Sequence, residues 1–388
     1  MRAACLALSI AICTLLLLMA ESARAGAPGA VGDLYVTSPG TNEVLQLDGD
    51  TGNPLGPFVA AGTGGLGVPT GLAFGPSGNL YVLSQGTDAI GDDAILEFGG
   101  WSGRFLGVFH SGLTNLLWEE GGSGELTWGP NGNLFVSNWV DNFGPPTFLP
   151  EAVEFDGRDG SIAQIYQSFE VCVWRPHALA IDTTSKLYLS SRNAPWQHIY
   201  AYDSATGSCD SLLVGAPFAS TSDISDGIEF GPNGNLFASR RYSRDVVEFD
   251  GATGALVGTF VSAGSGGLDT PGDLKFGPNR NLFVVNVDGR IFEYHGTDGS
   301  FVRVFSNAVI AGAQGDNQGR VRLAFKRSPC DDGLDNEGDG LIDLADPQCA
   351  NSSGNGEAGL GVGIGGCGIG PELAAVLPAL WLARRRRP

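Results

Sequence analysis

The chain has 388 residues and a formal net charge of −20, with 60 glycines and only 16% charged residues. This acidic balance excludes a nucleic-acid binder, which needs a basic surface, and the 43% hydrophobic content excludes an acidic disordered chain. Glycine shows no three-residue period, so a collagen-like rod is excluded as well.

The N-terminal segment 1–25 is predicted to be a secretory signal peptide. Residues 3–20 form an uncharged apolar run, and Ala-Arg-Ala at 23–25 offers a cleavage site between small residues. The alternative is a membrane-spanning helix, because 18 residues nearly cross a bilayer. The cleavage site favours the signal peptide and therefore export.

Residues 32–326 are predicted to contain six copies of one four-stranded unit. A strand of Leu, an aromatic residue and an aliphatic residue recurs every 46–54 residues, first at Leu34 and last at Leu282. A Gly-Pro turn precedes four of the copies, as at 231–232, and an Asp-Gly turn follows three of them, as at 250–251. Four short strands in a repeat of this length are typical of a β-propeller blade, so the predicted fold class is all-β.

The ring of blades is predicted to be closed by the two ends of the repeat region. The first copy begins at its second strand, and the missing inner strand is found at about 321–326. Pairing of this C-terminal strand with the N-terminal blade would complete a six-bladed β-propeller and remove exposed sheet edges. An open solenoid is the alternative, but a solenoid would not need a permuted sixth unit.

The repeated pattern P-x-G-L-x-F-G-P-x-G-N-L-[YF]-V resembles the NHL-repeat group of six-bladed propellers over residues 32–326. Because members of this group are mostly binding scaffolds, the resemblance implies a binding role. It also brings in virginiamycin B lyase and gluconolactonase relatives, which have the same blade count and are metal-dependent enzymes. The metal-holding positions of those relatives do not map onto this chain, so the resemblance assigns no catalytic residue.

The channel mouth, where the inner strands begin, is one candidate site. The residues expected there include Glu125, His177, Asp226 and Asp273. Carboxylates together with one imidazole suit a divalent metal, so a channel metal site is one hypothesis. Solvated acidic side chains around the channel of an acidic protein are the alternative.

Loops between the second and third strands of blades three to five form a second candidate site. They carry aromatic and arginine side chains, which dominate the hot spots of interfaces. The residues expected to bind a ligand are Trp139, Arg192, Trp196, Arg240, Arg241 and Tyr242. Ordinary variation of loop sequences is the alternative.

An acidic segment within 327–366 matches the spacing of an EF-hand calcium loop. When Asp335 is position one, glycine falls at position six and a main-chain carbonyl ligand at position seven. The expected calcium ligands are Asp335, Glu337, Asp339, Leu341, Asp343 and Asp346. Asp instead of Glu at position twelve departs from the usual pattern, and a disordered acidic linker is the alternative.

Cysteine usage fits an exported protein. Cys330 and Cys349 bracket the acidic loop and are predicted to form a disulfide. Cys172 and Cys209 either pair with each other or are both free. Cys367 is left over, as a processing site would require.

The C-terminal segment 367–388 contains an eleven-residue apolar stretch followed by four arginines. With its Gly-Cys-Gly at 366–368 it resembles the MYXO-CTERM sorting tails of Gram-negative bacteria. The resemblance implies cleavage near Cys367 by a rhombosortase- or myxosortase-like protease and transfer of the protein to the cell surface. A frayed hydrophobic C-terminus is the alternative.

These patterns together predict an exported, surface-anchored, monomeric propeller that binds a protein or glycan and holds calcium in its stalk. The competing prediction, from the enzyme class, is a metal-dependent lyase or lactonase with its site at the channel mouth. Convergence of Glu125, His177, Asp226 and Asp273 on one point would favour the enzyme. The fold alone does not choose between the two.

Overall fold

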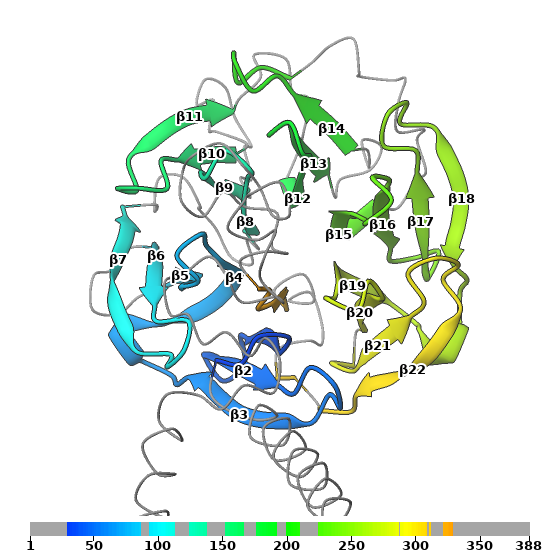
Figure 1. The fold of residues 1–388 in the computed structure, drawn as a ribbon, viewed down its shortest axis with the longest axis horizontal. Helices are drawn as coiled ribbons and strands as arrows, with labels where there is room; N and C mark the ends of the chain where they lie inside the picture. The colour runs from blue at the N-terminus through cyan, green and yellow to red at the C-terminus, as the bar shows by residue number, and fades with distance from the viewer. Residues whose placement is uncertain are drawn as a thin grey trace, which may run out of the picture.

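The chain is described here by a computed structural model at residues 29–86, 93–112, 124–137, 152–166, 176–191, 199–209, 224–286, 288–308, 310–311 and 321–328, with only the main chain described at 191 and 224–226. Over these ranges, six small antiparallel sheets stand around a central axis, one for each sequence repeat (Figure 1). The predicted all-β, six-bladed propeller is therefore confirmed.

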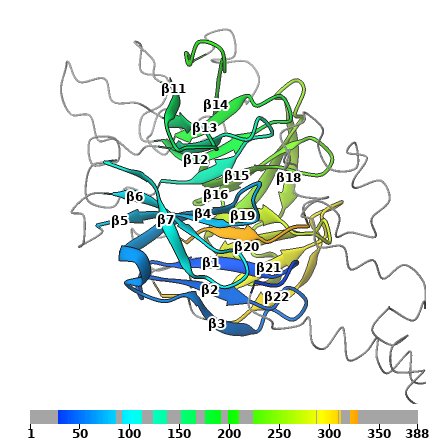
Figure 2. The same cartoon turned by 60° about the vertical axis from the view of Figure 1, so that its left-hand side comes forward.

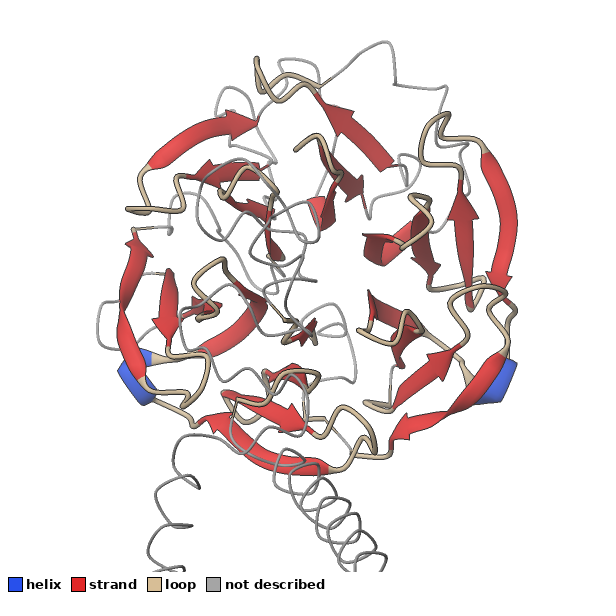
Figure 3. Cartoon of the chain, in the orientation of Figure 1, coloured by secondary structure: helices blue, strands red, loops and turns tan. Residues whose placement is uncertain are grey.

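Each blade runs from an inner strand near the axis to an outer strand at the rim (Figure 3). Apart from two short 3₁₀ turns at the rim, η1 (Thr63–Gly65) and η3 (Ser265–Gly267), the regular elements of the described ranges are strands. From the inner strand outward, blade one contains β23 (Leu323–Phe325), β1 (Leu34–Ser38), β2 (Glu43–Leu47) and β3 (Pro54–Val59); blade two β4 (Val68–Phe74), β5 (Leu80–Gln85), β6 (Ala94–Phe98) and β7 (Phe105–Ser111); blade three β8 (Leu126–Trp128), β9 (Leu134–Ser137), β10 (Ala152–Phe155) and β11 (Ile162–Tyr166); blade four β12 (Pro176–Ile181), β13 (Leu187–Ser191) and β14 (Ile199–Tyr202); blade five β15 (Ile224–Phe230), β16 (Leu236–Arg240), β17 (Asp245–Phe249) and β18 (Leu256–Val261); blade six β19 (Pro271–Phe276), β20 (Leu282–Asn286), β21 (Ile291–Tyr294) and β22 (Phe301–Ser306).

The ring closes as the permuted repeat predicts. Strand β23 pairs with β1 in antiparallel register, with Leu34 opposite Phe325 and Val36 opposite Leu323. Figure 2 shows this last strand, in orange, beside the first strand of the chain. Blade four differs from the other five, because its described part has three strands and an isolated bridge between Tyr202 and Cys209 in place of a fourth.

The hydrophobic core is divided among the six interfaces between neighbouring blades. Alternate residues of one strand serve different interfaces: Leu34 and Val36 pack against blade six, whereas Tyr35 between them packs against blade two. Because both faces of each sheet are buried, the second strand of each blade must be apolar along its whole length. This requirement explains the repeated run of Leu, aromatic and aliphatic residues.

The repeated aromatic residue joins each blade to the next. Tyr35 meets Phe74, the last residue of the inner strand of blade two, edge-on at 4.9 Å between ring centroids. Phe283 meets Phe325 of the closing strand at 4.8 Å in the same way. Edge-to-face geometry is the arrangement that the ring quadrupoles favour.

A polar pair fixes the turns of most blades. In blade five, Asn235 donates its side-chain N–H to Glu248 (2.7 Å), and its carbonyl oxygen accepts the N–H of Gly251 in the next turn (3.1 Å). Equivalent Asn–Glu pairs occur in blades two, three and six. In blade one the acid and the amide change places. Asp33 stands at the asparagine position and accepts a hydrogen bond from Gln46, which stands at the glutamate position (2.6 Å).

Blade four has lost both members of this pair together. Lys186 and Ala201 occupy the two positions that hold Asn and Glu in the other blades, as the strand register shows. Because a buried polar group without its partner is costly, loss of one member removes the reason to keep the other.

The propeller has two distinct faces. The turn face carries the Gly-Pro and Asp-Gly turns, which join the first strand to the second and the third to the fourth; the loop face carries the connections from the second strand to the third, such as 241–244. Both described ends of the chain meet on the turn face, where Lys326 Nζ donates to the carbonyl oxygens of Gly29 (2.8 Å) and Gly100 (2.7 Å).

Candidate functional site

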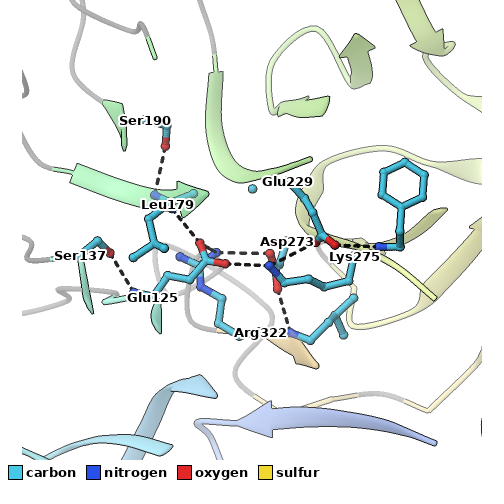
Figure 4. Close-up of polar contacts among 12 residues, drawn as sticks. Glu125, Ser137, Leu179, Ser190, Glu229, Asp273, Lys275 and Arg322 are labelled. Atoms are coloured by element: carbon cyan, nitrogen blue, oxygen red, sulfur yellow. Dashed lines mark hydrogen bonds and ion pairs between the residues drawn. The ribbon is translucent and has the colours of Figure 1, made fainter. Parts of the chain in front are cut away.

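The inner strands share one aligned apolar residue, and the residues on either side of it determine the chemistry of the channel. The aligned residues are Leu323, Leu72, Leu126, Leu179, Ile228 and Leu274 in blades one to six. Seven of the twelve flanking positions hold Gly, Ala or Thr, and the other five hold charged side chains. The charged residues are Glu125, Glu229, Asp273, Lys275 and Arg322. Glu125 of blade three lies within ion-pair distance of Lys275 of blade six and Arg322 of blade one, and neither of those blades is its neighbour. These side chains therefore meet in the central channel (Figure 4).

Arg322, which directly precedes the closing strand β23 of blade one, is at the centre of this network. Its side chain is only 1% exposed. The guanidinium Nη2 donates to the carbonyl oxygen of His177 (3.0 Å), and Nη1 lies 3.8 Å from one carboxylate oxygen each of Glu125 and Asp273. One side chain therefore connects blade one with blades three, four and six.

Lys275 makes the second connection across the channel. Its Nζ lies 3.1 Å from Glu125 in blade three and 3.2 Å from Glu229 in blade five. Burial alone would lower the pKa of Lys275, but the three carboxylates around it raise the pKa above its ordinary value. The ammonium is therefore charged at any physiological pH and holds the two acids together.

The acidic side chains are also bound to the main chain. Glu125 accepts a hydrogen bond from the N–H of Leu179 (3.1 Å), and Asp273 accepts one from Leu323 of the closing strand (2.8 Å). Burial raises the pKa of Asp273 to about 7, against the opposing effect of Lys275, and burial raises the pKa of Glu229 as well. The network therefore includes one carboxyl that titrates near neutrality.

The structure brings two of the four residues predicted for a channel site close to one cation. Glu125 and Asp273 both face Arg322, whereas His177 contributes its main-chain oxygen to that guanidinium. Asp226 lies in β15, and its side chain is outside the described part of the structure. Within the described residues, no group of three or more His, Cys, Asp or Glu side chains could hold a metal ion.

Sequence reasoning missed Arg322, Lys275 and Glu229. The signal was available, because aligning the six copies on the apolar residue of the inner strand places Arg322 level with Glu125 and Asp273, and Lys275 level with Glu229. The alignment of the repeats does not show which charges face each other, because that depends on how the ring closes.

The second candidate site, on the loop face, is described only in blade five. Arg240 donates to both carboxylate oxygens of Asp245, through Nε (2.7 Å) and Nη2 (2.5 Å), so it fixes the turn. Tyr242 at the tip of that turn is 75% exposed, and Arg241 beside it is partly buried. Trp139, Arg192 and Trp196 lie outside the described residues.

Apart from residues 327–328, the predicted stalk and tail also lie outside the described residues. This applies to the calcium loop at 335–346, to Cys330 and Cys349, and to Cys367. Cys209 is disulfide-bonded, and its partner is not among the described residues. None of the helices in the described ranges has the length and apolar character needed to span a bilayer.

Comparisons with known proteins support the fold. No protein-family model matches the chain, and no curated protein matches it in sequence. A chain in the crystal structure of a nidogen/laminin complex is 13% identical, with a TM-score of 0.51 over 75% of this chain and 97% of that chain. A protein of unknown function from Bacteroides caccae is 15% identical, with a TM-score of 0.50 over 76% and 98%. A gluconolactonase from Xanthomonas campestris is 17% identical, with a TM-score of 0.48 over 66% and 79%. At such identities the first two similarities show a shared propeller architecture and carry no function with them.

Proposed function

We propose that this chain is an exported propeller held at the cell surface, where it binds a protein or glycan ligand through its loop face. The observation that carries the proposal is the state of the channel. Glu125, Asp273 and Glu229 are joined there to Arg322 and Lys275, so the acids brace the ring. A carboxylate in such a pair serves as a metal ligand or base only after the pair is broken, and breaking a buried pair costs about 3–5 kcal/mol.

The geometry of the loop face supports the same assignment. Two hydrogen bonds from Arg240 to Asp245 close the turn at 240–245, and Tyr242 at the tip of this turn is 75% exposed. Exposed aromatic side chains such as Tyr and Trp often dominate interface energy. The chain continues toward its tail from the turn face, so a tether there would leave the loop face directed outward.

Calcium and anchoring belong to the proposal as well. The ligand spacing at 335–346 suits one calcium ion, and the Gly-Cys-Gly tail suits removal by a sorting protease. The competing enzyme would instead hold a metal at Glu125 and Asp273, and it would lose that metal when Glu125 is replaced.

The test uses residues 26–366, applied to a glycan array and to purified envelope proteins of the producing cell. We expect binding to fall at least tenfold in Tyr242→Ala and Arg241→Gln, and to be unchanged in Arg158→Gln, an exposed arginine on the turn face. Equal binding by all three variants would reject the loop face as the site. A tightly bound metal that is lost in Glu125→Ala, together with lactone hydrolysis, would support the enzyme instead.

A further inference from the structure

Among the six equivalent turns on the turn face, only the turn of blade two carries an aromatic residue, Trp101, at its third position. It occupies the third position of the turn between the third and fourth strands of blade two, and its side chain is 67% exposed. The five sister turns hold small or polar residues at that position, namely Asp50, Arg158, Ala205, Ala252 and Thr297. The turn itself therefore does not require an aromatic side chain. The residue next to the ring differs as well, because Lys326 stands where the other inner strands are followed by Gly or Asp.

The indole ring of Trp101 is held from beneath by a buried cation. Lys326 Nζ lies 3.5 Å from the ring centroid, and Lys326 is only 3% exposed. The same ammonium donates to the carbonyl oxygens of Gly29 and Gly100, so its position is fixed independently of the ring. A cation at this distance from an indole face attracts the ring, while the high exposure of the residue leaves indole surface open to solvent.

The main chain of the turn that carries Trp101 is closely packed and hydrogen-bonded. A Cβ atom on Gly29 would lie 2.4 Å from Trp101 Cα, so the main chain at Gly29 packs directly against the turn. Gly100 donates its N–H to the side chain of Asn79, and Gly103 donates to the carbonyl oxygen of Gly99 (2.8 Å). An exposed ring on a fixed turn pays little ordering entropy when a ligand covers it.

We propose that Trp101 is a stacking platform for one pyranose ring of a β-linked glycan. Pyranoses with equatorial substituents present a flat face of C–H bonds, which matches a single exposed indole. The side chains of Ser102 and Arg104, both exposed in the same turn, supply the hydrogen-bonding groups that sugar hydroxyls require. A protein partner would need a continuous surface of several hundred Å², whereas one sugar ring needs one aromatic face.

This platform lies on the face opposite Tyr242 and does not depend on the function proposed above. The test titrates the full chain, labelled with ¹⁵N, with cellohexaose and separately with chitotetraose, and follows the indole N–H signals. The signal of Trp101 is identified by its loss in Trp101→Phe. We expect that signal to shift with a Kd of about 0.1–1 mM, in the range that one stacked ring supports.

Three variants make the assignment specific. Trp101→Ala, a change at an exposed side chain, should abolish the binding, and Tyr242→Ala on the other face should leave it unchanged. Lys326→Met, which removes the cation beneath the ring, should weaken binding about threefold to tenfold. The proposal is overturned if neither oligosaccharide shifts the Trp101 signal at about 10 mM, or if Trp101→Ala binds as well as the original chain. A stronger effect of Tyr242→Ala than of Trp101→Ala would move the glycan to the loop face.

Discussion

Removal of Arg322 is expected to destabilise the propeller more than loss of any single surface charge. Replacement by methionine keeps most of the side-chain volume but leaves Glu125 and Asp273 without the guanidinium that lies 3.8 Å from each. It also removes the donor to the carbonyl oxygen of His177. Breaking a buried ion pair by deleting one partner costs about 3–5 kcal/mol, so Arg322→Met should lose about that much free energy of unfolding.

The free energy of unfolding that Arg322→Met loses should depend on pH, and the titration of Asp273 sets the direction. The pKa of this carboxyl is raised to about 7 in the folded chain, above its unfolded value, so the folded state binds more protons between pH 4 and pH 7. Stability from this group is therefore greatest at low pH and falls as the pH rises through that window. Without Arg322 the pKa of Asp273 rises further, so the deficit of Arg322→Met should be largest at pH 8 and smaller at pH 5.

Urea unfolding followed by circular dichroism at pH 8 and pH 5 measures both effects. For an m-value of about 3 kcal/mol/M, the expected loss moves the midpoint by about 1–1.7 M urea at pH 8. The matched control is Arg244→Met, because Arg244 pairs with Asp269 at 2.9 Å with side chains that are 61% and 54% exposed. Such a surface pair contributes at most about 1 kcal/mol. Adding Asp273→Asn to Arg322→Met should recover part of the loss; equal midpoints for Arg322→Met and the original chain at both pH values would refute the reasoning.

Three further outcomes follow from the structure. Asp273→Asn alone should abolish the fall in melting temperature between pH 4 and pH 7 that this carboxyl causes. Asn235→Ala should lower the free energy of unfolding by about 1–3 kcal/mol, because Glu248 and the N–H of Gly251 lose their partner. Lys186→Ala, at the same position of blade four, should lower it by less than about 0.5 kcal/mol in the same thermal melts. Metal analysis of the exported chain should find one calcium per chain, which a chelator removes with a drop in melting temperature and which Asp335→Ala prevents from binding.

The fold could be predicted because the pattern of one blade recurs six times in the sequence. One blade alone is an ambiguous set of short strands, but six copies in one register define the strands, the turns and the permuted closing strand. The pairing of Leu34 with Phe325 then follows from the requirement that every blade contain an inner strand. Blade four, which departs most from the repeat, is also the blade whose described sheet has three strands.

The channel could be predicted only in part. The sequence places Glu125 and Asp273 correctly at the inner strands, since both precede the repeated leucine. It does not reveal that a lysine of blade six reaches across the ring to Glu125, because blades three and six are far apart in the chain and meet only after closure. The hypothesis of a channel metal counts the acids at the mouth and leaves out the two cations that face them, so it stays a prediction for metal analysis to test.

The internal repeats also separate structural residues from candidates for function. Differences between blades that serve the fold are compensated by a second difference: Asp33 accompanies Gln46, Lys186 accompanies Ala201, and each charge in the channel has a partner of opposite sign. Trp101 departs from the repeat together with Lys326, which contacts its ring and still leaves the residue 67% exposed. Tyr242 departs from the repeat at a position that is 75% exposed. A ligand outside the chain would account for the exposed area of both aromatic side chains, which is why binding experiments on the two faces should come before further work on the channel.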